Sequence, residues 1–308
     1  MIRLLRRLLL VVLVLVAVGF AAFWVLTIPR SVSAGDLIPH KPDLANGERM
    51  FWAGGCESCH AARGADGDEQ LRLGGGQPLL TPYGTFRVPN ISPDPDNGIG
   101  KWTLADFVGA MKLGVAPGGV HLYPAFPYTS YQRMKVEDII DLKAFLDTLP
   151  KVATPSQPHD LPFPYNLRRG IGLWKLLYVD GHVLAPNPAF DEKQNLGAYL
   201  VEGPAHCGEC HTPRNFIGGP SREKFAGGPA PEGRGRIPNI TPARLKLSET
   251  EIAAFLKTGQ LDFDEVGGSM APVIRNTAKL SDADREAMAA YLKTIPPIEP
   301  PPRPPAAK

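Results

Sequence analysis

The longest apolar stretch of the chain runs from position 8 to 28 without a charged residue, and three arginines precede it. A helix of this length, rising about 1.5 Å per residue, crosses a hydrocarbon core of about 30 Å. Basic residues stay on the cytoplasmic side. The pattern therefore predicts that residues 1–34 anchor the chain once in a bacterial inner membrane, with all later residues facing the periplasm. The alternative is a cleaved signal peptide, with Val32 and Ala34 at the cleavage site, although its apolar region usually has only about 7–15 residues.

After the anchor, the same pattern occurs twice. A Cys-x-x-Cys-His pentapeptide is followed by a Pro-Asn-Ile string and then by an apolar helical pattern, which ends at Pro150 in one half and at Pro296 in the other. The halves are offset by 151 positions at the first cysteine, 149 at the asparagine and 146 at the final proline. This period far exceeds the roughly 20–50 residues of stacked repeats. It indicates a duplicated domain, over residues 35–150 and 195–296.

Each half is expected to begin and end with a helix. A short helix is expected at 45–51, and residues 196–201 occupy the same place in the second half. The terminal helices have apolar residues at helical spacing: Leu142, Phe145, Leu146 and Leu149 in the first half, Met288, Tyr291, Leu292 and Ile295 in the second. Gly47 and Gly197 would let the two helices of each half approach closely. With 33 prolines and 32 glycines, the expected fold is all-α with long loops.

Between the halves, residues 151–194 are rich in proline at first and then apolar. We expect a linker that packs across both halves. The alternative is a docking surface for a partner, formed by Trp174, Leu176, Leu177 and Tyr178. The proline-rich tail, 297–308, cannot bury a core and is expected to be extended or disordered.

The charge balance argues against a nucleic-acid partner. The net charge is +2, but four of the 33 basic residues lie in the N-terminal stretch, which leaves 29 basic against 31 acidic side chains. Nucleic-acid-binding domains are usually strongly basic. The expected partners are instead a membrane, through the N-terminal helix, and other proteins.

Two C-x-x-C-H pentapeptides contain all four cysteines of the chain: Cys56, Cys59 and His60 in the first, Cys207, Cys210 and His211 in the second. In such a pentapeptide the thiols and the histidine sit on about one helical turn. This arrangement suits covalent attachment of a c-type haem through thioether bonds, with the histidine on the iron. Zinc sites also use Cys-x-x-Cys pairs, but closing one over such a long separation is unusual. We therefore expect two covalently bound haem c groups.

Each haem iron also needs a sixth ligand, and methionine is the ligand that raises the potential. In the second half Met270 is the candidate, because it lies in a glycine-rich loop before the last helix. The matching loop of the first half, 121–131, has no methionine. Met134, just after it, is the preferred candidate there, followed by His121 and then by an open site. Packing is the alternative role of both methionines, and an alignment without gaps places Met134 opposite Leu280.

Several strings together resemble the cytochrome c subunits of bacterial membrane-bound alcohol, gluconate and aldehyde dehydrogenases. They are the two pentapeptides and residues 81–85, 89–94, 98–103, 121–131 and 207–215. The resemblance covers residues 44–296 and implies two tandem class I-like cytochrome c domains. It also implies that the protein takes electrons from a periplasmic dehydrogenase. The electrons would then pass to quinone, a terminal oxidase or a downstream cytochrome of the respiratory chain.

The chain departs from that family in two places. Those subunits often have three haem motifs, whereas two occur here, and many carry methionine where Phe126 stands. Arg87, Arg214 and Asn215 are expected either to contact haem propionates or to be plain surface residues. We expect an electron-transfer protein without catalysis of its own. The alternative is a dihaem redox enzyme, peroxidase-like or thiosulfate dehydrogenase-like, with an open or unusually ligated first haem.

Overall fold

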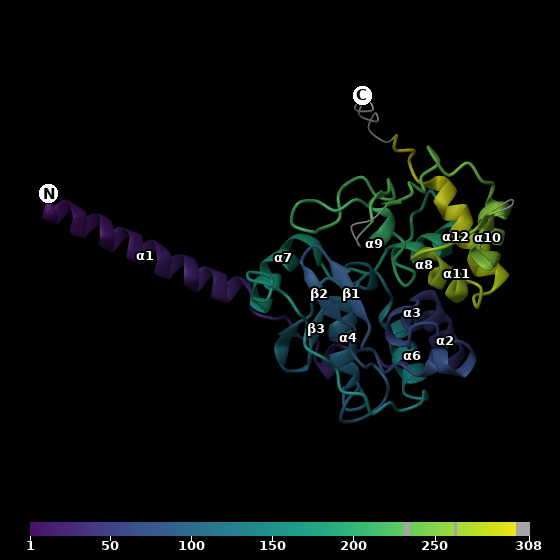
Figure 1. Ribbon diagram of the computed structural model, residues 1–308, viewed down its shortest axis with the longest axis horizontal. Coiled ribbons are helices and arrows are strands. Elements are labelled where there is room, and N and C mark those ends of the chain that lie inside the picture. Colours follow the sequence, from purple (N-terminus) through teal and green to yellow (C-terminus); the bar gives the residue numbers. More distant parts are fainter. Residues whose placement is uncertain (231–234, 262–263, 300–308) are drawn as a thin grey trace.

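One long helix projects from a body of short helices and loops in the computed structural model (Figure 1). The structure describes residues 1–230, 235–261 and 264–299, so most of the expected extended tail, 297–308, lies outside the described residues. The helices are α1 (Ile2–Leu26), α2 (Leu44–Ala53), α3 (Cys56–His60), α4 (Leu104–Leu113), α5 (Tyr128–Tyr131), α6 (Val136–Leu146), α7 (Ile171–Tyr178), α8 (Glu192–Glu202), α9 (Gly208–His211), α10 (Glu249–Thr258), α11 (Met270–Thr277) and α12 (Asp282–Thr294).

Four short antiparallel hairpins accompany the helices in the described part of the chain. They pair β1 (Pro78–Thr81) with β2 (Gly84–Arg87), β3 (Val115–Ala116) with β4 (Val120–His121), β5 (Gly228–Pro229) with β6 (Arg236–Ile237), and β7 (Gln260–Leu261) with β8 (Asp264–Glu265). The expectation of a purely α-helical fold missed them. Strands of two to four residues are too short to leave an alternating apolar signal. The core itself is helical, as expected.

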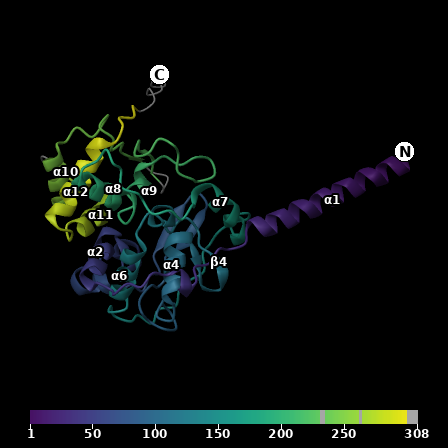
Figure 2. The same ribbon diagram turned by 180° about the vertical axis from the view of Figure 1, so that it is seen from behind.

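Each half is built on one pair of crossing helices, α2 with α6 and α8 with α12 (Figure 2). The predicted glycines lie at the crossings. A Cβ on Gly47 would come 2.2 Å from the Asp141 carbonyl oxygen, and one on Gly197 would come 1.8 Å from that of Ala287. Only glycine allows backbones to approach this closely. The predicted helix contact is therefore confirmed in both halves.

Capping side chains decide where these helices begin. The Asp43 carboxylate accepts hydrogen bonds from the backbone N–H groups of Ala45 and Asn46, which starts α2 at Leu44. In the second half Asp191 and Gln194 form a capping box, in which each side chain binds the backbone of the other residue. Helix α8 thus begins at Glu192, three positions before the expected start of that half at 195. The apolar pattern could not show these extra residues, because they are polar and add no apolar position to it.

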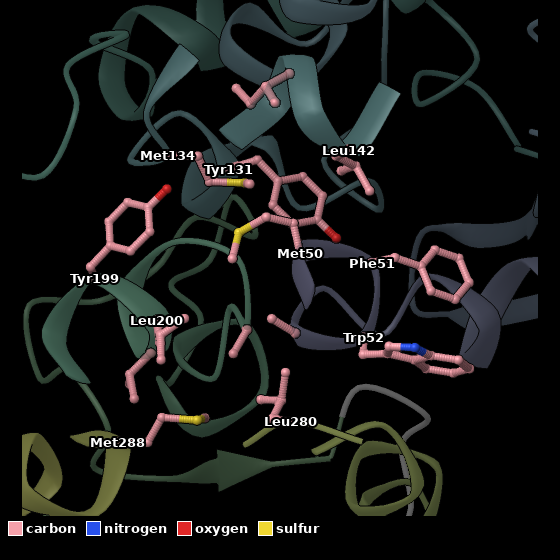
Figure 3. Close-up of a cluster of buried hydrophobic side chains, with 14 of the residues drawn as sticks. Met50, Phe51, Trp52, Tyr131, Met134, Leu142, Tyr199, Leu200, Leu280 and Met288 are labelled. Carbon is pink, nitrogen blue, oxygen red and sulfur yellow. The ribbon is translucent and has the colours of Figure 1, made fainter. Parts of the chain in front are cut away.

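Both halves contribute to one apolar core. Figure 3 shows this shared cluster, which includes Met50, Tyr131 and Met134 from the first half and Tyr199, Leu200 and Met288 from the second. An ion pair crosses between the halves beside it: a guanidinium nitrogen of Arg49 lies 2.6 Å from the carboxylate of Asp284, whose side chain is buried. The two halves are therefore packed as a unit and are not separated like beads on a flexible linker.

Helix α1 is the one helix in the described residues that is long and apolar enough to cross a membrane, judged by length and composition. None of its residues is buried against the body. The residue after it is different, because Thr27 is completely buried. Arg169 donates hydrogen bonds to the Thr27 hydroxyl (2.9 Å) and to the Trp24 carbonyl (2.7 Å), and its guanidinium lies 3.9 Å from the centre of the Trp24 ring. These contacts bind the end of α1 to the body of the protein.

Candidate haem-binding sites

The two pentapeptides form matching one-turn helices. The first is α3, and Cys207 caps the second, α9. No disulfide joins the four cysteines, all of which lie in the described part of the chain. Burial raises the pKa of the Cys56 and Cys207 thiols to about 12. Both are therefore neutral thiols at pH 7.

The two motif histidines have the same hydrogen bond. His60 Nδ1 donates to the Pro89 carbonyl (2.8 Å), and His211 Nδ1 donates to the Pro238 carbonyl (2.9 Å). This bond fixes the tautomer and leaves the Nε2 lone pair available to a metal. Burial lowers the pKa of His60 to about 4 and also lowers that of His211, so both rings are neutral at pH 7. The residues present therefore fit an iron-ligating histidine in each half.

The asparagine after each of these prolines holds the loop in place. The Asn90 side chain donates to the carbonyls of Val152 (2.6 Å) and Thr154 (2.9 Å) and accepts from the Ser92 backbone. Asn239 repeats this arrangement with the backbone of Ile298 and Thr241. The repeated Pro-Asn string marked the duplication in the sequence. The structure adds that this string orients the histidine and bonds it to the segment after the last helix. In the sequence, only the presence of the string in both halves hinted at such a role.

The structure places the two candidate methionines differently. Met270 is the first residue of α11 and is half-buried against the core. Met134 is 1% exposed, inside the core that both halves share, and its Cγ lies 3.6 Å from where a Cβ on Gly203 would be. Leu280, which the alignment places opposite Met134, is buried as well. The position of Met134 thus suits a packing residue at least as well as a ligand.

Both ring nitrogens of His121 are used at the base of α1. Its Nε2 donates to the Thr27 carbonyl (2.9 Å), and its Nδ1 lies 3.1 Å from the Lys175 amine. Burial lowers the pKa of Lys175 to about 7, which favours the uncharged amine in this closed contact. This geometry disfavours His121 as an iron ligand and gives it a structural role.

Of the three candidate propionate residues, two have partners for their side chains, and the third has a partner for its backbone only. Arg214 donates to the backbone carbonyl of Glu209 (2.7 Å) and pairs with its carboxylate, and Asn215 donates to the Tyr178 hydroxyl (2.8 Å). For Arg87, the backbone N–H donates to a ring nitrogen of His159 (3.1 Å). Arg214 and Asn215 therefore help to hold the second motif and the linker.

Zinc is not supported by the arrangement of potential ligands. Across residues 1–230, 235–261 and 264–299, no group of three histidine, cysteine or acidic side chains comes together to hold a metal ion. A structural zinc site needs about four such ligands around one point. The donor sets that do exist are the two separate pentapeptides.

Comparisons with known proteins agree with this chemistry. The cytochrome c family model matches residues 44–150. A dihaem c-type cytochrome of Cereibacter sphaeroides is 52% identical over 93% of this chain and 97% of the relative. The fructose dehydrogenase cytochrome subunit of Gluconobacter japonicus is 37% identical, and the cytochrome c subunit of a quinone-dependent alcohol dehydrogenase of Gluconacetobacter polyoxogenes is 35% identical. They align with 83% and 88% of this chain, which spans 53% and 60% of their own lengths.

The chain belongs to the cytochrome c family. This membership confirms the predicted resemblance and implies covalently bound haem c. It also confirms the prediction of an electron-transfer protein rather than an enzyme.

In this cytochrome each motif helix contacts the opposite half of the molecule. Asn276, on α11, donates hydrogen bonds of 2.8 Å to the Glu57 carboxylate and to the Ser58 hydroxyl. In return, the Glu209 carboxylate accepts from the hydroxyls of Thr129 (2.5 Å) and Ser130 (2.8 Å), on α5. The residues between the two cysteines of each motif thus bind the other half close to its sixth-ligand candidate. Glu209 binds α5, which lies just before Met134, and Glu57 binds α11, which begins with Met270. Nothing in the repeat indicated this exchange.

A second contact joins the backbones beside the two motifs. His206, just before Cys207, donates from Nε2 to the Gly54 carbonyl (3.2 Å), which also accepts from the Tyr131 hydroxyl (3.3 Å). The His206 and Tyr131 rings meet edge to face, with centroids 5.5 Å apart. The approach to one motif is thereby bonded directly to the approach to the other.

Proposed function

We propose that this protein is a membrane-anchored dihaem cytochrome c that relays electrons from a periplasmic dehydrogenase to the respiratory chain. The single observation that carries the proposal is the duplicated site. Each half presents a pentapeptide in a one-turn helix, with a histidine whose Nδ1 is bonded to a proline carbonyl. When bound, haem c supplies a one-electron iron couple. The chain supplies attachment, ligation, burial and the spacing of the two sites.

The proposed binding residues follow from that geometry. Cys56 and Cys59 would hold one haem and Cys207 and Cys210 the other, each half forming a cytochrome c domain. His60 and His211 are oriented as the first ligands. Met270 is the proposed sixth ligand in the second half, because it stands at the start of a helix and is only half-buried.

For the first half, Met134 remains the proposed sixth ligand, and an open position is the alternative. In place of the methionine common in the family, Phe126 packs against Tyr131, with ring centroids 5.3 Å apart. An open iron would leave the first haem accessible to small ligands. Carbon monoxide binding to the reduced protein distinguishes the two, because only an iron without a strong sixth ligand binds it readily.

Passage of electrons between the sites is supported by the way the halves meet. The motif helices lie against opposite halves, and their approaches are bonded through Gly54, Tyr131 and His206. Buried contacts of this kind hold the two sites at a fixed separation. A fixed separation suits a relay, because the distance between the two sites then does not change from one electron transfer to the next.

The partner assignments rest on the relatives. The cytochrome subunits of fructose and alcohol dehydrogenases align with more than four-fifths of this chain, so a periplasmic dehydrogenase is the proposed donor. The proposed acceptor is quinone, a downstream cytochrome or a terminal oxidase. Retention of α1 as the anchor is supported by Thr27. Cleavage after Ala34 would remove this buried residue, and with it the partner of His121 Nε2 and both hydrogen-bond partners of Arg169.

Two double variants test the haem count. We expect Cys56→Ser/Cys59→Ser and Cys207→Ser/Cys210→Ser each to lose half of the covalently bound haem, measured as pyridine haemochrome per polypeptide and by the mass of the intact chain. Membrane extraction of the wild type with carbonate checks the anchor. A colourless wild-type protein, or one that releases all its haem on denaturation, would rule out the proposal.

A further inference from the structure

Helix α7, in the linker between the halves, has an exposed apolar face. Its Lys175 and Gly172 are buried, and Trp174 donates to the Ile217 carbonyl (3.1 Å), so these three face the body. The remaining side consists of leucines with large exposed fractions: Leu173 at 41%, Leu176 at 56% and Leu177 at 67%. The segment just before α7 exposes three more large apolar side chains, Phe163, Tyr165 and Leu167. Such a concentration of exposed apolar side chains in one segment indicates a contact surface.

This face continues the apolar surface of α1. A Cβ on Gly172 would come 2.7 Å from the Thr27 side chain, so the two helices touch at this point. Leu176 lines a small hollow together with Leu26 and Ile28, the last apolar residues of the anchor. Figure 1 shows α7 at the base of the projecting helix. Whatever surrounds the outer end of α1 therefore also reaches the leucines of α7.

The charges around the face suit phospholipid headgroups. Residues 161–179 contain no acidic residue and carry the guanidinium groups of Arg168 and Arg169, whereas the Lys175 amine is buried against the body. Arg30, which follows α1, is exposed, lines the same hollow as Leu176 and reaches the Val179 carbonyl (3.4 Å). Trp24 adds an aromatic ring of the kind enriched where a membrane meets water. Leucines flanked by cations are typical of helices that lie in the membrane interface.

We propose that α7 is an interfacial helix, whose Leu173, Leu176 and Leu177 insert into the outer surface of the same phospholipid bilayer that α1 crosses. The inference rests on the proposed membrane anchoring. It adds a second point of attachment, and two points fix the tilt of the body where one helix alone would let it swivel. Both haem-binding halves would then keep a constant height above the lipid.

The test uses full-length, haem-loaded protein in vesicles of phosphatidylcholine and phosphatidylglycerol, with no other protein. Because the native cysteines are used by haem, an introduced cysteine is the one thiol available to a nitroxide label. Leu177→Cys probes the α7 face and Leu10→Cys probes the anchor. Ala254→Cys is the control, because it is exposed on α10, on the far side of the body from α1. All three positions are exposed, so the variants should fold.

Collision rates with oxygen, which concentrates in lipid, and with a water-soluble nickel chelate locate each label. We expect the labels at positions 177 and 10 to favour oxygen and the label at 254 to favour nickel. If the label at 177 behaves like that at 254 while the label at 10 is in lipid, the inference is overturned and the face is free for a protein partner. If the label at 10 is also in water, the proposed anchoring fails, and this inference fails with it.

Discussion

The two halves of this cytochrome share a plan but differ where they meet each other. Both place an acid between the cysteines of the motif, Glu57 in one and Glu209 in the other, and both acids bind the opposite half. Glu57 has an amide as its close partner, with Arg275 at 3.9 Å, whereas Glu209 is paired with Arg214 at 2.5 Å. The Cys-x-x-Cys-His pattern and the hydrogen bond of its histidine are the same in both halves. The surfaces that became internal contacts diverged, because each had to complement a different neighbour.

The methionine candidates give the largest expected difference. We expect Met270→Leu to lower one haem potential by a substantial part of the roughly 0.8 V range that axial ligands control. The low-spin spectrum of that haem should be lost as well. Redox titration with magnetic circular dichroism measures both. An unchanged spectrum would mean that Met270 only packs against the core.

Met134→Leu sharpens the same comparison. If Met134 binds iron, this variant changes the spectrum of the first haem. If it only packs, the spectrum stays and stability changes by less than about 1.5 kcal/mol, because leucine and methionine have similar volumes. Leu280→Met is the matched control from the other half and should leave both potentials unchanged.

Replacing the glycine at the helix crossing should destabilise the protein to a similar extent in either half. Gly197→Ala would force a methyl group against the Ala287 carbonyl, and Gly47→Ala would do so against that of Asp141. We expect each to lower the free energy of unfolding by at least the roughly 1–3 kcal/mol typical of overpacked sites, Gly197→Ala slightly more. Urea unfolding followed by circular dichroism measures this. Gly170→Ala is the control, because nothing lies within 4 Å of its added methyl.

The contributions of the two buried acids to stability should change with pH in opposite directions. Burial raises the pKa of Glu57. Its contribution to stability is therefore present below the unfolded pKa and is lost as the pH rises through the folded pKa. Burial also acts to raise the pKa of Glu209, but Arg214, Thr129 and Ser130 together lower it. The contribution of Glu209 is thus present above the unfolded pKa and is lost as the pH falls through the folded pKa.

Glutamine variants of the two acids test the smallest of the expected differences between the halves. At pH 7 we expect Glu209→Gln to cost about 1.5–3 kcal/mol, the usual contribution of a hydrogen bond to a charged group. Glu57→Gln should cost little or even stabilise, since the amide oxygen can still accept from Asn276. Unfolding at pH 7 and at about pH 3 checks both signs, and equal losses at pH 7 would contradict the comparison.

The sequence could predict the features that depend on neighbouring residues or on repetition. The long apolar helix, the Cys-x-x-Cys-His helices and the glycines at both helix crossings are local patterns, and duplication made the last two visible twice. The sequence also narrowed the sixth ligand to a few residues. It could not choose among them, because ligation depends on where a side chain ends in space.

Only the tertiary structure decided which parts of the two halves touch. The sequence offered His121 as a ligand, but the fold uses both of its nitrogens beneath α1. It offered no sign that Asn276 reaches Glu57 across more than 200 positions, or that His206 bonds to Gly54. Contacts between distant segments depend on how two packed surfaces fit together. A linear pattern records the period of each helix but not the neighbour against which that helix is packed.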